Sequence, residues 1–226
     1  MMLNFPTTII DDFFENVDDV LKIAHSDKVD WKPAEDGSWP GIRSQKIVDI
    51  DSHFFHFYMK KFLNIYYTHE DIKEQDISFK SKSYFHRADP KVPSGYIHSD
   101  FPVCCTSLIY LTRNADVRAG TSFYTKKDIN EYNFNGEWRE NKLKYYSSQI
   151  TPEEAEPYIK HNNSNFVKDT WVGYKFNRFL NFDSHIWHGV EDYNSNTDEE
   201  RLTMVTFVDA ITVDNKPITR MRQIQK

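Results

Sequence analysis

The sequence is poor in cysteine and has no long apolar run, and each deficiency excludes a class of protein. Cys104 and Cys105 are the only cysteines among 226 residues. Their Cα atoms would lie about 3.8 Å apart, closer than ordinary disulfide geometry tolerates, so we expect two reduced thiols packed in a strand and no disulfide framework. No apolar run approaches the roughly 18 residues of a membrane-spanning helix, and no signal-peptide pattern is present. We therefore expect a soluble cytoplasmic protein without membrane association, in the host cytoplasm if the chain is viral.

Positive charge is also in deficit. The chain has 28 Lys and Arg residues against 34 Asp and Glu residues, which gives a formal net charge of −6. A protein that binds nucleic acid by releasing counter-ions needs a broad basic surface, so a nucleic-acid partner is not expected, although a local basic groove stays open. The sequence also has no Ser-His-Asp set, no Gly-rich phosphate loop, no zinc-type Cys cluster and no HExxH element.

The chain is long enough for one domain with a full core. We expect N-terminal helical support over about residues 1–76 and a β-rich core over about 77–213, interrupted by an insertion over about 126–171. In the core, short strand-like runs alternate with Pro- and Gly-containing stretches, which is typical of a sandwich or barrel. The polar insertion, with one short helix at Pro152–Lys160, is either a lid over the substrate site or a solvated loop with no direct role.

The N-terminal region mixes helical and extended patterns. Apolar residues at helical spacing predict a helix over about Asp12–Ala24, capped by one of the aspartates at its start, and a second helix over Ser52–Tyr66. Ser44–Ile50 alternates apolar and polar residues as a strand does. Residues 32–41 contain several Pro and Gly residues, which indicate a loop.

A His-x-Asp pair beside a strand-like segment is the first candidate for a metal site. About one such pair is expected by chance, and the chain has three: His25/Asp27, His69/Asp71 and His98/Asp100. Side chains at i and i+2 leave the same face of a strand but diverge on a helix. Only the third pair is followed by a β-rich run, Val103–Thr112, so His98 and Asp100 are the candidate ligands. A buried His bonded to a nearby Asp is the alternative interpretation.

The third ligand has two candidates, because His185 and His188 lie three residues apart. Gly189 and Val190 suit a strand that enters a tightly packed barrel, which favours His188 as the ligand. His185 then lies near the site in a supporting position or is simply exposed. Two His and one carboxylate on one face of an ion leave three positions open, which is the arrangement of non-haem Fe(II) oxygenases.

Five short motifs occur in an order that resembles a known enzyme superfamily. HSD, IYLT, AGTSFY, HGV and RLT, between Lys82 and Asp209, are similar to the series in Fe(II)/2-oxoglutarate-dependent dioxygenases, above all in their prolyl 4-hydroxylase-like branch. The resemblance implies a mainly β (α+β) fold: a double-stranded β-helix core of the jelly-roll, cupin-like type, braced outside by N-terminal helices. It also implies that His98, Asp100 and His188 bind Fe(II) at the open mouth of the barrel.

The same resemblance assigns residues to a 2-oxoglutarate site. Arg201 lies 13 positions (201 − 188) beyond the distal His and shares a strand face with Thr203. A guanidinium and a hydroxyl so placed can bind the far carboxylate of 2-oxoglutarate; a surface Arg paired with Glu199 or Glu200 is the alternative. Further wall residues are implied, each of which core packing explains as well: Tyr84, Tyr110, Thr121, Phe123, Tyr96 and Trp187.

The activity implied by the resemblance is hydroxylation of a C–H bond. The enzyme would consume 2-oxoglutarate and O2, release succinate and CO2, and use ascorbate as an accessory reductant, with a peptide, a protein or a small molecule as substrate. Three rivals stay open: a jelly-roll protein that binds metal or a small acid without catalysis, a zinc-dependent hydrolase, and an oxidative nucleic-acid demethylase. The hydrolase would need a general base beside the open site, and the net charge disfavours the demethylase.

Overall fold

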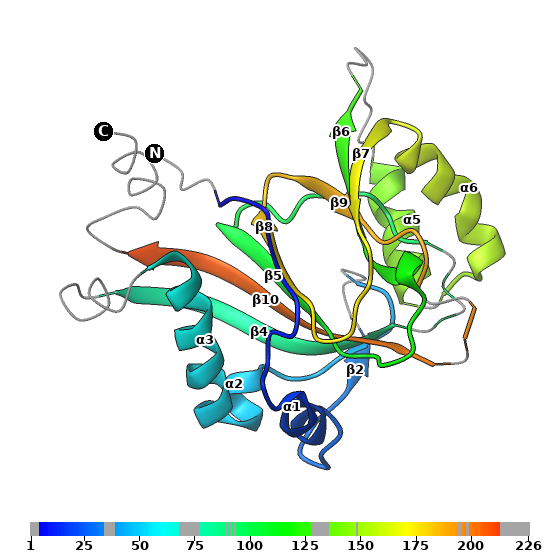
Figure 1. Ribbon diagram of the computed structural model, residues 1–226. Coiled ribbons are helices and arrows are strands. Elements are labelled where there is room, and N and C mark those ends of the chain that lie inside the picture. Colours follow the sequence, from blue (N-terminus) through cyan, green and yellow to red (C-terminus); the bar gives the residue numbers. More distant parts are fainter. Residues whose placement is uncertain are drawn as a thin grey trace, which may run out of the picture.

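Two antiparallel β-sheets form the centre of the molecule (Figure 1). The computed structural model describes residues 5–33, 39–67, 77–88, 90, 92, 94–127, 136–147, 149–193, 196–197 and 199–212. The larger sheet has seven strands in the order β1-β8-β5-β10-β4-β3-β2, and the smaller has three in the order β7-β6-β9. Their bounds are β1 Thr8–Ile10, β2 Lys32–Pro33, β3 Ile42–Arg43, β4 Ser78–Ala88, β5 Cys105–Tyr110, β6 Thr121–Lys126, β7 Phe166–Val172, β8 Phe179–Asp183, β9 Trp187–Gly189 and β10 Arg201–Thr212.

The two sheets pack face to face around a small aromatic core. Phe123 of β6 contacts Phe182 of β8 with ring centroids 5.1 Å apart. Tyr110 of β5 and Val172 of β7 belong to the same buried cluster. Because these side chains come from both sheets, they join the layers into the mainly β architecture that the sequence predicts.

Three helices lie on the outer face of the larger sheet (Figure 1): α1 Val17–Ala24, α2 Ile47–Ile50 and α3 Ser52–Tyr66. The bounds of α3 are those predicted, since Asp51 caps its start by accepting a 2.9 Å hydrogen bond from the backbone N–H of Phe54. Tyr58, Met59 and Phe62 of α3 are fully buried against the sheet. The described part of the chain contains no helix whose length and apolarity would allow it to cross a membrane.

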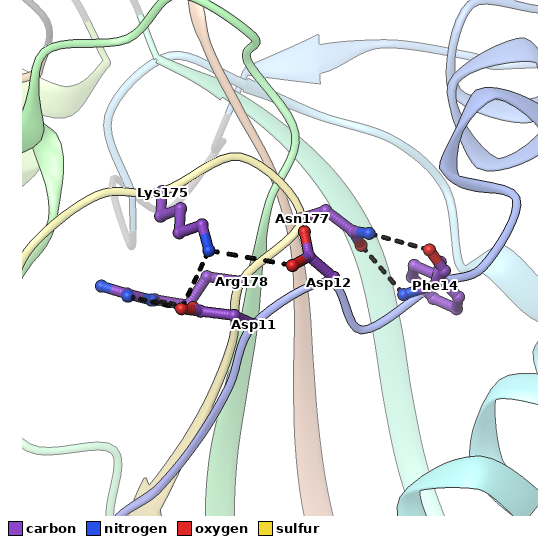
Figure 2. Close-up of polar contacts among 6 residues, drawn as sticks. All are labelled: Asp11, Asp12, Phe14, Lys175, Asn177 and Arg178. Atoms are coloured by element: carbon purple, nitrogen blue, oxygen red, sulfur yellow. Dashed lines mark hydrogen bonds and ion pairs between the residues drawn. The ribbon is translucent and has the colours of Figure 1, made fainter.

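Helix α1 begins at Val17, so the predicted start near Asp12 is wrong. Asp12 has a positive φ of 52°, a conformation that a right-handed helix cannot contain. Asp11 does not cap the helix either: its carboxylate accepts hydrogen bonds from the guanidinium of Arg178, the shorter of 2.6 Å (Figure 2). The aspartates that the local pattern assigns to a helix cap therefore form tertiary ion pairs instead, Asp11 with Arg178 and Asp12 with Lys175.

The segment before α1 is fixed further by Asn177, which precedes β8 (Figure 2). The side-chain amide of Asn177 accepts from the backbone N–H of Phe14 at 3.0 Å and donates to the carbonyl of Phe14 at 2.8 Å. Asn177 itself has a φ of 59°, which Asn tolerates better than most residues. These bonds place Phe13 and Phe14 in the core under α3.

The predicted strand over Ser44–Ile50 is also wrong, because its second half is the single helical turn α2. Ile47 is completely buried, and over so few residues an alternating pattern and one helical turn place apolar side chains alike. The strand pairing lies just before, where β3 pairs with β4. Ser44 continues this contact, since it donates its backbone N–H to Phe85 and accepts the N–H of Phe85 on its hydroxyl.

The described part of the expected insertion contains regular secondary structure. It contains the helices α5 Gly136–Tyr146 and α6 Pro152–Asn163. The short helix predicted there is α6, which is longer than predicted and starts with a capping box between Thr151 and Glu154. The final residues of the expected insertion, from Phe166 onward, are in strand β7, which pairs with β6. The last part of the expected insertion therefore belongs to the smaller sheet.

Candidate active site

His98, Asp100 and His188 lie together at a cavity between the sheets. Each offers one ligand atom, and these atoms lie within 4.8 Å of one another; in the described residues this is the one such group. Nε2 of His188 is 3.4 Å from Oδ2 of Asp100, and Nε2 of His98 is 3.6 Å from Oδ1. Ligands at about 2.1 Å from an ion and at right angles would be about 3 Å apart. The spacing therefore suits three ligands on one face of a metal ion.

The backbone joins His98 to β9. The N–H of His98 donates to the carbonyl of His188 at 3.0 Å, and the N–H of His188 donates to the carbonyl of His98 at 2.8 Å. Asp100 donates its N–H to the carbonyl of Ser184 at 2.9 Å. We expected His98 and Asp100 at the end of a strand; they lie instead in an extended segment whose contact with β9 is an isolated bridge. Even so, the spacing of two residues brings both side chains to the same ion-sized space.

Hydrogen bonds fix the tautomers of both imidazoles. Nδ1 of His98 is 2.9 Å from the carbonyl oxygen of Tyr96, and Nδ1 of His188 is 2.9 Å from that of Ile186. A carbonyl oxygen can only accept, so each Nδ1 carries the proton and each Nε2 has a free lone pair. Both lone pairs therefore belong to the nitrogens that lie next to Asp100.

Electrostatics favour the protonation states that bind a cation. Burial, together with the neighbouring His188, lowers the pKa of His98 to about 3, so its imidazole is neutral at neutral pH. Burial works against ionisation of Asp100, but the two imidazoles and a hydrogen bond from the Thr106 hydroxyl together lower the pKa of its carboxyl group. The site thus presents a neutral imidazole at His98 and a carboxylate at Asp100 to a cation.

The cavity has a volume of about 530 Å³, within the range of small-molecule sites. Its wall includes Trp39, Arg43, His86, Thr121, Arg201 and Thr203 as well as the three candidate ligands. His86 has Nε2 2.6 Å from the carbonyl oxygen of Pro40, and burial lowers its pKa to about 3. His86 is therefore a neutral wall residue whose hydrogen bond is already satisfied.

Arg201 is buried among three tyrosines. Its guanidinium carbon lies 5.4 Å from the ring centroid of Tyr110, 5.9 Å from that of Tyr174 and 5.8 Å from that of Tyr193. Burial raises the pKa of Tyr174 and of Tyr193 to about 12, so these phenols are neutral and offer aromatic faces to the cation. With 3% of its surface exposed, Arg201 is not the surface residue of the alternative interpretation.

Polar atoms on this part of the wall lack protein partners. Arg201 donates from Nε to the carbonyl of Ala119 at 2.8 Å, but its Nη2 is buried without a hydrogen-bond partner. Oγ1 of Thr203, two residues along the same face of β10, is also buried without a hydrogen-bond partner. Buried donors normally have partners, so the two atoms fit a carboxylate of a bound acid.

The two tyrosines predicted for the co-substrate pocket have different positions. Tyr110 is fully buried and its hydroxyl pairs with Oγ1 of Thr121 at 2.8 Å, so it supports Arg201 and Thr121 from behind. Tyr84 is not among the residues that line this cavity. It lines a separate one of about 400 Å³, together with Arg43. The implied direct role of Tyr84 at the co-substrate therefore has no geometric support.

The remaining candidates lie behind or beside the cavity. Tyr96 is fully buried in a cluster with α5 and α6, and Trp187 packs on Phe166 with ring centroids 4.9 Å apart. Phe123 is in the core between the sheets. His185 bonds to Asp183 at 2.9 Å instead of joining the candidate ligands. Of the other His-x-Asp pairs, that at residue 25 lies at the end of α1, and that at residue 69 is outside the described residues.

Several residues of the site were not anticipated from the sequence: Arg43, His86, Lys142, Tyr146 and Tyr193 on the cavity wall, and Tyr174 beside Arg201. They come from β3, β4, α5 and the loops around β8 and β9. None belongs to a motif, and their contacts with the site connect positions far apart in the chain. Only an excess of aromatic residues, 13 Tyr among 226 positions, hinted at such a wall.

The fold is the double-stranded β-helix, or jelly-roll, of 2-oxoglutarate/Fe(II) oxygenases, as predicted. HygX from Streptomyces hygroscopicus, solved with nickel and 2-oxoglutarate bound, has a TM-score of 0.54 and 12% identity, over 90% of this chain and 82% of HygX. SnoK, a non-haem α-ketoglutarate-dependent carbocyclase of nogalamycin biosynthesis, has a TM-score of 0.54 and 12% identity, over 93% and 82%. An oxidoreductase of the 2OG-Fe(II) oxygenase family from Burkholderia pseudomallei has a TM-score of 0.50 and 9% identity, over 90% and 85%.

The chain belongs to DUF6445, described as a family of unknown function, whose family model matches residues 4–208. No curated protein matches the sequence significantly. At identities of 9% to 12% the structural likeness shows the fold alone. The similarity to prolyl 4-hydroxylases that the motifs indicate stays a prediction.

Proposed function

We propose that this protein is an Fe(II)- and 2-oxoglutarate-dependent oxygenase, with one catalytic domain that hydroxylates a C–H bond. One observation carries the proposal. The cavity that holds the ligand atoms of His98, Asp100 and His188 also holds buried atoms of Arg201 and Thr203 that have no protein partner. A metal at the first group and a dicarboxylic acid at the second would satisfy both.

His98, Asp100 and His188 would hold the metal. Two neutral imidazole nitrogens and one carboxylate oxygen suit Fe(II) with open positions on its other face. Thr106 donates to Oδ2 of Asp100 at 2.6 Å and so orients the carboxylate. The donor set and its support thus fit the metal.

Arg201 and Thr203 would bind the far carboxylate of 2-oxoglutarate. The planar guanidinium can donate two parallel hydrogen bonds, and Nη2 is the donor left over after Nε has bonded to Ala119. Tyr110, Tyr174 and Tyr193 keep water from the guanidinium, which strengthens a charged hydrogen bond. We call these three tyrosines the tyrosine cage. The acid would then extend from Arg201 inside this cage to the metal ligands.

When bound, iron with 2-oxoglutarate and O2 supplies the oxidising chemistry, in which 2-oxoglutarate yields succinate and CO2 and one oxygen atom enters the substrate C–H bond. The chain contributes orientation and a dry cavity. The Nδ1–H groups of its two histidines bond to backbone carbonyls, which fixes the orientation of both rings and directs each Nε2 toward Asp100. Ascorbate would serve only to keep the iron reduced.

The charges of the cavity wall support a substrate with an anionic group. Arg43 and Lys142 line the cavity in addition to Arg201, and Asp100 is the one carboxylate in the described lining. A divalent metal, Asp100, Arg201 and doubly charged 2-oxoglutarate have formal charges that cancel. Arg43 and Lys142 add positive charge to the same wall, which favours an anionic group on the substrate, whether a small molecule or a peptide side chain.

The deciding experiment is anaerobic addition of Fe(II) and 2-oxoglutarate to the purified protein. Chelation of the co-substrate should give the weak visible charge-transfer band in the wild type and none in His98→Ala. His185→Ala is the matched control, since His185 bonds to Asp183, and it should keep the band. A wild-type protein without the band, or a His98→Ala variant that keeps it, would overturn the assignment.

Turnover separates the enzyme from a non-catalytic binder. With O2 admitted, an oxygenase should form succinate slowly even without its substrate, whereas a jelly-roll that only binds metal and acid would give the spectral band alone. Binding of single-stranded DNA that weakens steeply with salt would favour the demethylase instead.

A further inference from the structure

The segment that carries His98 is paired with a strand along one edge. His98 exchanges two backbone hydrogen bonds with His188. Successive residues of an extended chain direct their backbone groups to opposite edges. The N–H and carbonyl of Ile97 therefore lie on the other edge, and they need partners there.

Side chains from the end of α6 supply those partners in place of a strand. Oδ1 of Asn163 accepts the N–H of Ile97 at 3.0 Å, and Nδ2 of Asn162 donates to the carbonyl of Ile97 at 3.2 Å. Nδ2 of Asn163 also donates to the carbonyl of Gly95 at 3.1 Å. An Asn amide both donates and accepts, as a peptide group does, so two adjacent Asn residues complete the edge.

Helix α5 adds a contact to the same segment. The hydroxyl of Tyr146 accepts the N–H of Tyr96 at 3.1 Å, and the two rings meet edge to face with centroids 5.8 Å apart. The carbonyl of Tyr96 is in turn the group that accepts the Nδ1 proton of His98. Helix α6 therefore holds the peptide group between Tyr96 and Ile97, which orients the imidazole of His98, and α5 holds the peptide group before it.

We propose that α5 and α6 form a clamp that positions His98, in which Asn162, Asn163 and Tyr146 are the positioning residues. Figure 1 shows both helices beside the smaller sheet. The insertion is then required for the geometry of the metal site. This role differs from both earlier alternatives, a lid over the substrate site and a solvated loop with no direct role. The proposal rests on the proposed function only for the role of His98 as a ligand.

Asn163→Ala tests the clamp with two measurements on the full chain. Without the acceptor, the backbone N–H of Ile97 should exchange with deuterium at least tenfold faster in the metal-free protein. Affinity for Mn(II), measured by calorimetry, should fall about 10- to 100-fold, because loss of a group that orients a metal ligand typically has an effect of this size. Asn165→Ala is the matched control, because the side-chain amide of Asn165 donates to the backbone carbonyls of His161 and Asn162 and not to the segment that carries His98, and it should change neither value.

Asn163→Asp provides a second variant that keeps the acceptor for Ile97 but not the donor to Gly95. It should retain slow exchange at Ile97 and lose less Mn(II) affinity than Asn163→Ala, and it carries the test if the Ala variant does not fold. Wild-type affinity for Mn(II) in Asn163→Ala, or unchanged exchange at Ile97, would overturn the clamp. If the wild type bound no divalent metal, the proposed function would fail, while the exchange measurement would still report on the clamp.

Discussion

Oγ1 of Thr106 donates a 2.6 Å hydrogen bond to Oδ2 of Asp100. Thr106 lies on β5 with 2% of its surface exposed, so it reaches the carboxylate from inside the sheet and fixes its orientation. Thr106→Val removes the hydroxyl with little change of volume, and we expect Mn(II) affinity to fall about 10- to 100-fold. Calorimetry checks this, with Thr106→Ser as the variant that should bind normally. Equal affinity of the Val variant and the wild type would contradict the role.

Arg201 and Thr203 should differ in how much they contribute to 2-oxoglutarate binding. Loss of a charged hydrogen bond costs about 1.5–3 kcal/mol and of a neutral one about 0.5–1.5 kcal/mol. We therefore expect Arg201→Met to weaken binding by about 10- to 100-fold and Thr203→Val by less than about tenfold. Titration of the charge-transfer band measures both. Thr206→Val is the control, because Thr206 pairs with Ser83 on the other face of β10 and should leave the affinity unchanged.

Asn177 should be important for stability and not for the active site. It is 4% exposed, has a φ of 59° and makes two side-chain hydrogen bonds to Phe14. Asn177→Ala loses both bonds and replaces Asn by a residue that tolerates the left-handed region less well. The free energy of unfolding should therefore fall by about 2–4 kcal/mol. Urea unfolding measures the change. Asn177→Gly relieves only the backbone strain and should be less destabilised than Asn177→Ala; the reverse order would contradict this account.

The contact of Asp11 with Arg178 makes stability depend on pH (Figure 2). The hydrogen bond from Arg178 lowers the pKa of Asp11 from 3.8 to about 2. A group whose pKa is depressed by folding stabilises the fold above its unfolded pKa, and this stabilisation is lost as pH falls from about 4 to about 2. Asp11→Asn should therefore be less stable than the wild type at pH 6, and the difference should shrink toward pH 2. A difference that is constant across this range in urea unfolding would exclude the linkage.

Arg43 should select substrates that carry an anionic group. Its guanidinium stacks on Trp39, 3.8 Å from the ring centroid, on the wall of the cavity. In a screen of matched carboxylates and amides, we expect carboxylates to stimulate succinate formation more strongly. Arg43→Gln should reduce this preference at least tenfold, because the variant loses one charged hydrogen bond to the substrate. The affinity for 2-oxoglutarate should stay unchanged. A preference that survives in the variant would assign selection to another residue.

Local pattern predicted those parts of the fold whose signals are long or strong. Helix α3 was found with its limits because Phe55, Met59 and Phe62 recur at helical spacing. Four residues are too few to separate a helical turn from a strand, so α2 was assigned wrongly. The start of α1 was wrong for a different reason: Arg178, distant in the chain, binds the aspartate that would otherwise have served as a cap.

The sequence by itself determined the chemical types available for a site: His98 and Asp100 at a spacing that a chain in extended form turns to one side, His188 before a Gly, and Arg201 with Thr203 on one face of a strand. Only the tertiary structure decided that the first three meet and that a tyrosine cage encloses Arg201. It also decided that two Asn residues of α6 complete the edge beside His98. Strand pairing and side-chain packing connect residues tens of positions apart, and no local periodicity records such contacts.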